Sequence, residues 1–208
     1  IDYDSGNLFS ILRACEIVGM KASITRDKKE IENSDCLILP GVGSFPNAIN
    51  SIKKYELYEV VEKFVASGKR LLGICLGAQL LLSKSYEFSE VDGFGFIEGH
   101  VELIRKFSLL NKLKVPHIGW NNFELKLLKS PTSLFDDLVH QYFYFVHSYI
   151  MCPRNHSEVI GETKFEDVKF ASIIRKENII GVQFHPERSG PSGIKFFQNL
   201  KSNIQSEL

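Results

Sequence analysis

The spacing of apolar residues along the first half of the chain alternates between a helical and an extended pattern. Leu8, Ile11 and Cys15 recur at intervals of three and four, which predicts an amphipathic helix that ends near Gly19. Short apolar runs bounded by Gly or Pro predict buried strands. We therefore expect helices over residues 6–20, 45–68 and 76–85, and strands over residues 21–27, 36–41 and 69–75. This alternation predicts a parallel sheet covered by helices on both faces.

The second half of the chain is richer in strand patterns. They predict strands over residues 93–104, 115–126, 142–150, 157–164, 169–177 and 178–185. Residues 176–179 are expected to form a hairpin turn, and residues 192–205 a closing helix. We find no internal repeat, linker or low-complexity stretch. The prediction is a single α/β domain over residues 1–208: a mostly parallel central sheet flanked by helices, with an antiparallel strand appendage.

Composition and charge narrow the class of protein. Hydrophobic residues make up 44% of the 208 residues and charged residues 24%, which is typical of a globular core. The 25 basic and 25 acidic side chains balance, so nothing in the charge favours nucleic acid as a partner. No apolar run reaches the ~18 residues of a membrane helix, and no secretory signal is recognisable. We therefore expect no membrane association and a cytoplasmic location.

The cysteines are widely separated and form neither a CxxC pair nor a Cys/His cluster. They are Cys15, Cys36, Cys75 and Cys152. A disulfide scaffold is not expected in a chain with this much apolar residue, so a reducing compartment fits best. The spacing also predicts no metal site, and we expect no cofactor.

Cys75 lies at the centre of the sequence GICLG, between a predicted strand and a predicted helix. A G-x-nucleophile-x-G sequence in this context is typical of a sharp turn that presents a nucleophile at the carboxyl end of a strand, where ligands bind in open α/β sheets. Gly73 and Gly77 would let the neighbouring backbones pass close to the turn. The alternative is a buried cysteine in an ordinary tight turn.

A cysteine nucleophile needs a base, and the base needs an orienting group. His185 and Glu187 stand two residues apart around Pro186, which prevents a helix, so both side chains point to the same side of an extended segment. His185 can then face the thiol while Glu187 fixes its tautomer. A surface turn is the alternative. The other histidines lack such a partner and are expected to be structural or exposed; they are His100, His117, His140, His147 and His156.

Acyl transfer from an amide also requires hydrogen-bond donors for the oxyanion. The stretch LPGVGSF ends another predicted strand, and its glycines let backbone N–H groups turn towards an anion, with Gly43 the strongest candidate. Leu76, directly after the cysteine, is the second expected donor. An ordinary glycine loop is the alternative, but all three fragments lie at strand ends, as a single site requires.

Together, GICLGAQ, GVQFHPE and LPGVG resemble the class I, triad-type glutamine amidotransferases. The resemblance implies that Cys75 is the nucleophile of glutamine hydrolysis, His185 the general base and acid, and Glu187 the orienting carboxylate. It also implies a substrate-binding set, which comprises Gln79 and the backbone near His147, Ser148 and Tyr149.

The stretches IDYDSGNL, VPHIGWN, YFVHSY and HPERSG are similar to the family of glutaminase subunits of imidazole glycerol phosphate synthases. That similarity implies a heterodimer with a (β/α)8-barrel cyclase subunit, which uses the ammonia in histidine biosynthesis. The chain has no GxxxxGK[ST] motif, so the acceptor chemistry belongs on another polypeptide. Asp4 and Ala78 stand where the family has Gly and commonly Met. They leave open a paralogue that serves another synthase, such as one that amidates a sugar for a surface polysaccharide.

Three residues are expected at the interface with the partner. By family position, Asn7 and Arg188 resemble partner-contacting residues. Trp120 is the only tryptophan and lies in the polar sequence GWNN. Tryptophan is a preferred interface anchor, and packing in the core is the alternative.

Overall fold

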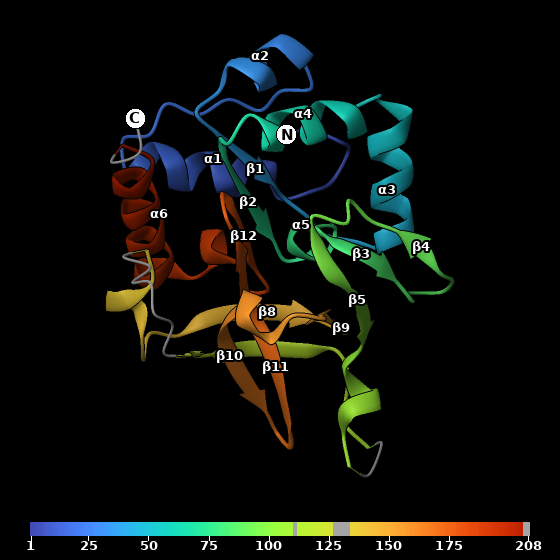
Figure 1. The fold of residues 1–208 in the computed structure, drawn as a ribbon. Helices are drawn as coiled ribbons and strands as arrows, with labels where there is room; N and C mark the ends of the chain where they lie inside the picture. The colour runs from blue at the N-terminus through green and yellow to red at the C-terminus, as the bar shows by residue number, and fades with distance from the viewer. Residues whose placement is uncertain (110–111, 127–133, 206–208) are drawn as a thin grey trace.

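Helices lie on both sides of the parallel part of a large mixed sheet in the computed structural model, which describes residues 1–109, 112–126 and 134–205 (Figure 1). The helices are α1 (Leu8–Ile17), α2 (Lys28–Asn33), α3 (Phe45–Lys54), α4 (Tyr58–Ala66), α5 (Leu76–Gln79) and α6 (Gly190–Gln205). The strands are β1 (Cys36–Leu39), β2 (Arg70–Ile74), β3 (Leu82–Ser85), β4 (Val91–Asp92), β5 (Ile97–Leu103), β6 (His117–Asn121), β7 (Glu124–Leu125), β8 (Phe143–His147), β9 (Tyr149–Pro153), β10 (Val159–Phe165), β11 (Val168–Lys176) and β12 (Ile179–Val182).

Within the described residues, ten strands form one sheet in the order β1-β2-β12-β11-β9-β5-β3-β4, with β10 beside β11 and β7 beside β10. β1, β2 and β12 run parallel, whereas β11 is antiparallel to β12 and to β9. β6 and β8 form a separate antiparallel pair. The predicted fold class is confirmed, and the antiparallel strands continue the central sheet.

The parallel strands are buried on both faces. Leu71 and Leu72, neighbours on β2, are fully buried in two different hydrophobic clusters. One cluster includes side chains of α3 and α4, and the other includes side chains of α1 and α6. Since successive side chains of a strand point to opposite faces, α3 and α4 cover one face and α1 and α6 the other (Figure 1). This double burial explains the continuous apolar run of β2.

Strand register brings three separate segments to one edge of the sheet. Leu39 on β1 and Gly181 on β12 both pair with Gly73 on β2. The residues that follow these strands therefore lie side by side, and they include the loop at residues 40–43, Cys75 and the segment that leads to His185. The three fragments expected at strand ends are thus close enough to form a single site.

One predicted strand is wrong. Residues 21–27 form neither strand nor helix. Thr25 O accepts a hydrogen bond from Asp2 N–H at 2.8 Å, but no ladder of backbone bonds extends from this contact. An extended sequence pattern therefore did not suffice here, because a strand also needs a neighbour to pair with over several residues.

The helix expected over residues 76–85 is wrong in its second half. It ends after one turn as α5, and β3 follows, with Leu82 paired to Ile97 on β5. Leu80, Leu81 and Leu82 are all fully buried. A short, wholly apolar run has no period that distinguishes a helix from a buried strand.

Other predicted elements are present but divided. The helix over residues 45–68 breaks between α3 and α4, where Glu56 has a φ of 53° and Leu57 turns into the core. The strand over residues 142–150 breaks at Ser148, so that β8 joins the small sheet and β9 the large one. The expected hairpin at residues 176–179 is confirmed by the antiparallel pairing of β11 and β12.

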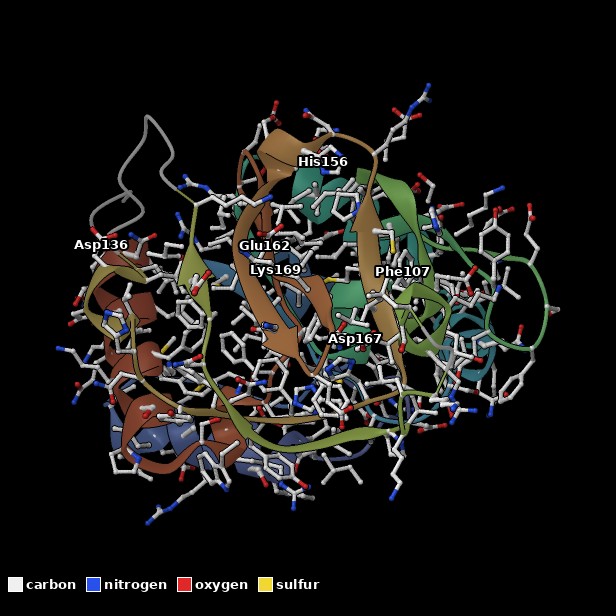
Figure 2. The ribbon with its side chains drawn as sticks, turned by 90° about the horizontal axis from the view of Figure 1, so that it is seen from below. Phe107, Asp136, His156, Glu162, Asp167 and Lys169 are labelled. Carbon is white, nitrogen blue, oxygen red and sulfur yellow. The ribbon has the colours of Figure 1, made fainter. Side chains whose placement is uncertain are left out.

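Charged side chains lie on the β10–β11 hairpin, where Figure 2 labels Glu162, Asp167 and Lys169. Glu162 on β10 forms ion pairs with Lys126 Nζ at 2.7 Å and with Lys169 Nζ on β11 at 3.1 Å. Exposed pairs of this kind contribute about 0–1 kcal/mol each. Among the helices of the described residues, none has the length and apolar character that crossing a membrane requires.

Candidate active site

Cys75 lies on a sharp turn between β2 and α5. Its φ of 52° and ψ of −108° are rarely adopted outside glycine and cost on the order of 1–3 kcal/mol. The flanking glycines leave no room for side chains: a Cβ on Gly73 would lie 2.7 Å from Ala78 Cα, and one on Gly77 would lie 1.9 Å from Leu39 O. The close approach of these backbones therefore holds Cys75 in its strained turn.

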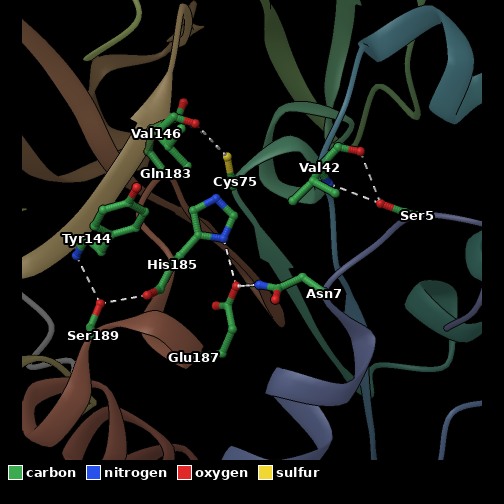
Figure 3. A network of polar contacts seen from close by, with 10 residues as sticks. All are labelled: Ser5, Asn7, Val42, Cys75, Tyr144, Val146, Gln183, His185, Glu187 and Ser189. Carbon is green, nitrogen blue, oxygen red and sulfur yellow. Dashed lines mark hydrogen bonds and ion pairs between the residues drawn. The ribbon is translucent and has the colours of Figure 1, made fainter. Parts of the chain in front are cut away.

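The segment after β12 carries His185 to the same edge of the sheet. Cys75 N–H donates to Val182 O at 2.7 Å, so the end of β12 lies beside the turn. His185 N–H donates to Tyr144 O at 2.8 Å, and His185 O accepts from Ser189 Oγ at 2.6 Å (Figure 3). These bonds fix the backbone of His185 between β8 and the start of α6.

His185 and Glu187 form a buried pair beside Cys75. His185 Nδ1 lies 2.7 Å from Glu187 Oε1, and the two side chains are 2% and 1% exposed. The same carboxylate oxygen accepts a hydrogen bond from Asn7 Nδ2, just before α1. The opposite ring nitrogen, His185 Nε2, faces Cys75 in Figure 3 and has no hydrogen-bond partner within the described residues. The carboxylate therefore selects the tautomer in which Nδ1 carries the proton.

The charge of the imidazole depends on these neighbours. Burial by itself lowers the pKa of His185, but a thiolate at Cys75 and the carboxylate of Glu187 outweigh it, and the pKa is raised to about 10. The positive charge that the imidazole gains on taking a proton is thus stabilised by the neighbouring sulfur and by Glu187. The arrangement can both activate the sulfur and return a proton to a leaving group.

The loop at residues 40–43 borders the thiol and is tied to the N-terminal segment. Gly43 has a φ of 107°, which glycine adopts at little cost. Val42 N–H donates to Ser5 Oγ at 3.0 Å, and the Ser5 hydroxyl lies 3.3 Å from Val42 O (Figure 3). Ser5 therefore bonds both the N–H and the carbonyl of Val42, which belong to the peptide groups before and after that residue.

These groups surround a cavity of about 790 Å³. All the sequence-predicted site residues line it except Glu187, which lies behind His185, and Trp120. The lining members of the predicted set are Asn7, Gly43, Cys75, Leu76, Gln79, His147, Ser148, Tyr149, His185 and Arg188. The cavity is large enough for a small polar substrate and carries few but convergent polar groups.

Gln79 is nearly buried, and its amide nitrogen is fully engaged. Nε2 donates to Tyr149 O at 3.0 Å and to Gln183 Oε1 at 3.2 Å. A side-chain amide nitrogen carries two hydrogens, so both are used in these bonds. Oε1 is therefore the atom of Gln79 that remains for a ligand, and it can act only as an acceptor.

The ring of His147 lines the cavity but is pinned in place. His147 Nδ1 lies 2.9 Å from Tyr149 O, and His147 Nε2 lies 3.1 Å from His117 Nδ1. Burial lowers the pKa of His147 to about 3 and that of His117 to about 4. Both rings are neutral at pH 7, so neither is suited to proton transfer there. Within the described residues, no cluster of three His, Cys, Asp or Glu could hold a metal.

Sequence reasoning missed two residues of the site. Glu87 follows β3, is 9% exposed and lines the cavity, and its Oε2 accepts the Phe45 N–H at 2.7 Å. Burial raises the pKa of Glu87. Gln183 is fully buried, and its Nε2 lies 3.7 Å from Cys75 Sγ. Gln183 stands two residues before His185 in an extended stretch, so the period of two could have found it. The extended segment expected from His185 to Glu187 is wrong, because Pro186–Arg188 form a 3-10 helix, and this turn brings Glu187 to His185.

An aromatic surface lies beside the cavity. Trp120 on β6 is 56% exposed, which excludes the core-packing alternative, and Ile118, two residues earlier, is 59% exposed. The Trp120 ring contacts Tyr144 with ring centroids 6.0 Å apart, and the Arg188 guanidinium lies 5.2 Å from the Tyr144 centroid. Trp120, Ile118, Tyr144 and Arg188 form what we call the aromatic surface, and its Arg188 also lines the cavity.

Comparison with known proteins assigns the chain to a family. A model of the class-I glutamine amidotransferases matches residues 1–201. The chain therefore belongs to the class I glutamine amidotransferase family and is a glutamine-hydrolysing enzyme subunit.

Its relatives include the imidazole glycerol phosphate synthase subunit HisH of Lactococcus lactis, which is 43% identical over 205 residues, covering 98% of this chain and 97% of that protein. The HisH subunit of Carboxydothermus hydrogenoformans is 39% identical over 98% of both chains. Among solved structures, PurLQS from Thermotoga maritima matches with a TM-score of 0.73 at 18% identity, over 98% of this chain and 96% of that one. The structural match supports the fold, and the relatives place the chain among HisH-like glutaminases.

Proposed function

We propose that this chain is the glutaminase subunit of an imidazole glycerol phosphate synthase, which hydrolyses glutamine and passes the ammonia to a partner subunit. The observation that carries the proposal is the buried set of Cys75, His185 and Glu187, which opens into the 790 Å³ cavity. The near-full-length identity to HisH subunits supports this acceptor pathway over a paralogue that amidates a sugar.

In the proposed mechanism, His185 Nε2 takes the proton of Cys75, and the thiolate attacks the side-chain carbonyl carbon of glutamine. Leu76 N–H and Gly43 N–H stabilise the resulting oxyanion. The intermediate collapses as His185 returns the proton to the leaving nitrogen, so ammonia departs and a glutamyl thioester remains. Water, deprotonated by His185, then cleaves the thioester, and glutamate leaves. Glu187 orients the imidazole throughout and stabilises its positive charge.

The cavity also suggests how glutamine is oriented. Gln79 Oε1 and the Glu87 carboxylate are both acceptors on the cavity wall, which suits the α-ammonium group of an amino acid. Backbone groups at His147, Ser148 and Tyr149 are proposed to hold the rest of the substrate. Both N–H groups of Gln79 donate to other residues of the protein, so only its Oε1 remains for a ligand. A free acceptor supports the placement of the ammonium group beside it.

The proposed partner is a (β/α)8-barrel cyclase in a cytoplasmic heterodimer, and the 208-residue chain acts as one amidotransferase domain. The aromatic surface is the proposed contact, because exposed tryptophan and arginine are typical of interface centres. Asn7 is proposed to lie at the margin of this contact, although its amide is bonded to Glu187. Complementation of a histidine auxotroph distinguishes this acceptor from a sugar substrate.

The test of the proposed function uses two nitrogen sources. In the complex with the cyclase, Cys75→Ala is expected to abolish synthesis from glutamine and to leave synthesis from ammonium salts intact, because Cys75 acts only in ammonia release. Cys152→Ala, which removes a cysteine outside the cavity, is the matched control and should retain both activities. Equal loss with both nitrogen sources would disprove the division of labour.

A further inference from the structure

Gln183 is a buried polar side chain to which the proposed mechanism gives no task. It is fully buried between β12 and His185, and its backbone N–H donates to Ser172 O on β11 at 2.8 Å. Its side chain has two polar contacts: Oε1 accepts from Gln79 Nε2, and Nε2 lies 3.7 Å from Cys75 Sγ. Burying an amide is unfavourable unless both of its ends are bonded, so the Nε2–sulfur contact matters for the fold as well as for the site.

The direction of the Gln183 amide is set by a chain of bonds that begins at a backbone carbonyl. Tyr149 O can only accept, so Gln79 must present Nε2 to it. The second hydrogen of Gln79 Nε2 then points at Gln183, whose oxygen must face it. Gln183 therefore turns its NH₂ group, not its oxygen, towards Cys75. This connectivity fixes the orientation of the Gln183 amide.

Two neighbours of the sulfur favour opposite protonation states. Cys75 Sγ lies 3.9 Å from Val146 O, a carbonyl that can accept a bond from a thiol but repels a thiolate. Gln183 Nε2, on the other hand, is a donor and strengthens its bond when the sulfur becomes negative. Since the site is buried, each of these contacts acts through a low dielectric.

We propose that Gln183 is a thiolate-stabilising residue: its Nε2–H bonds the ionised sulfur of Cys75, offsets the Val146 carbonyl and keeps the sulfur within reach of His185. The Gln79 bond to Gln183 Oε1 holds that donor in place, so the substrate-binding residue and the nucleophile share one hydrogen-bonded chain. This inference rests on the proposed role of Cys75 as nucleophile.

The test compares two replacements of Gln183. Gln183→Glu has the same shape and still accepts from Gln79, but it cannot donate to the sulfur. Gln183→Met is uncharged and also lacks the donor. Ser172→Ala is the matched control, because it removes a neighbouring buried hydroxyl that has no partner within the described residues. Near-UV circular dichroism establishes that each variant is folded.

The first readout is the pH dependence of alkylation of Cys75 by iodoacetamide, followed by mass spectrometry of the Cys75 peptide. A hydrogen bond to a charged group changes an equilibrium roughly 10- to 100-fold, so the midpoint should rise by about 1–2 pH units in both Gln183 variants, more in Gln183→Glu. Glutaminase kcat should fall by a similar factor, with KM within about twofold. Ser172→Ala should change neither quantity.

A second readout uses the wild-type protein and does not depend on the folding of a variant. The side-chain amide resonances of Gln183 should shift with pH at the same midpoint as alkylation of Cys75. Unshifted resonances, or an unchanged alkylation midpoint in both folded variants, would overturn the proposal. Alkylation requires no glutamine. If the chain showed no glutaminase activity, the proposed function would be wrong, but the alkylation midpoints would still test the role of Gln183.

Discussion

Each group of the proposed triad depends on a neighbour that takes no part in the chemistry. Cys75 keeps its strained φ because Gly73 and Gly77 let adjacent backbones pass within contact distance. His185 is fixed by its backbone bond to Tyr144. Glu187 shares one oxygen between the imidazole and a second donor. The reactivity of the triad therefore depends on how firmly each group is held in position. Replacing the three residues should reduce glutamine turnover by unequal factors.

We expect His185→Ala to reduce glutamine turnover nearly as much as Cys75→Ala, because without the base the thiol is neither activated nor able to return a proton. Glu187→Gln should cost roughly 10- to 100-fold less, since an amide still bonds Nδ1 but stabilises the imidazolium poorly. The double variant His185→Ala/Cys75→Ala should be no worse than either single variant. Steady-state glutaminase assays of the partnered enzyme measure all four.

His156→Ala is the control for that series, because His156 is exposed and outside the cavity. It should retain wild-type turnover. Near-normal turnover of His185→Ala would show that another group acts as the base, and additive losses in the double variant would show that the two residues do not act as one unit.

At the scale of elements, the small β6–β8 sheet holds an uncharged histidine pair, of which His147 lines the cavity. His117 pairs with His147 across the two strands, and its ring stacks on Phe165 with centroids 4.0 Å apart and on Phe145 at 5.0 Å. Charging either ring would place a cation among these aromatic side chains and beside the other histidine. The pair thus links the stability of this sheet to pH.

We expect the free energy of unfolding to fall as the pH is lowered from about 6.5. The pKa values of His147 and His117 are lowered to about 3 and about 4, from an ordinary value of 6.5. Between these limits the unfolded chain binds more protons than the folded chain, so stability is lost on acidification, by at most about 1.4 kcal/mol per pH unit for each ring. Urea unfolding at pH 7, 6 and 5 measures the slope.

The double variant His117→Gln/His147→Gln is the control for this prediction, because it retains polar side chains but cannot titrate. Its stability should depend less on pH over the same range, whatever the buried carboxylates contribute to both proteins. The same slope in variant and wild type would mean that other groups account for the acid sensitivity.

Elements with a clear period or a clear turn were predictable from the sequence, and the errors have common physical causes. Leu8, Ile11 and Cys15 recur at helical spacing, and α1 forms where they do. Leu80 to Leu82 have no such period, and only the pairing with β5 determines that β3 is a strand. The candidate nucleophile and its base lie in motifs, whereas Glu87 reaches the cavity through a fold that its neighbours in sequence do not indicate.

At the scale of the whole molecule, the cavity is assembled from segments that are distant in the chain. The N-terminal segment holds the loop after β1 in place through hydrogen bonds that a bound partner could break. Ser5, before α1, bonds both Val42 N–H and Val42 O in the loop after β1, and Val42 O belongs to the peptide that carries Gly43 N–H. Next to it, Gly43 can rotate its peptide at little steric cost. The aromatic surface lies beside the same cavity, so a partner bound there is well placed to act on this loop.

We expect the isolated chain to hydrolyse glutamine poorly and the cyclase subunit with its ligand to raise turnover, mainly through kcat. One oxyanion donor is worth ~10²–10³ in kcat, so rotation of the Gly43 peptide into a donating position would account for activation of that size. Ser5→Ala, which frees the Val42 peptide, should raise the rate of the isolated chain by part of this factor, whereas Ser23→Ala, outside the cavity, should not. Steady-state kinetics with and without the cyclase decide between the outcomes. Full activity of the isolated chain would rule out the switch, and a change confined to KM would show that the partner completes the glutamine site instead.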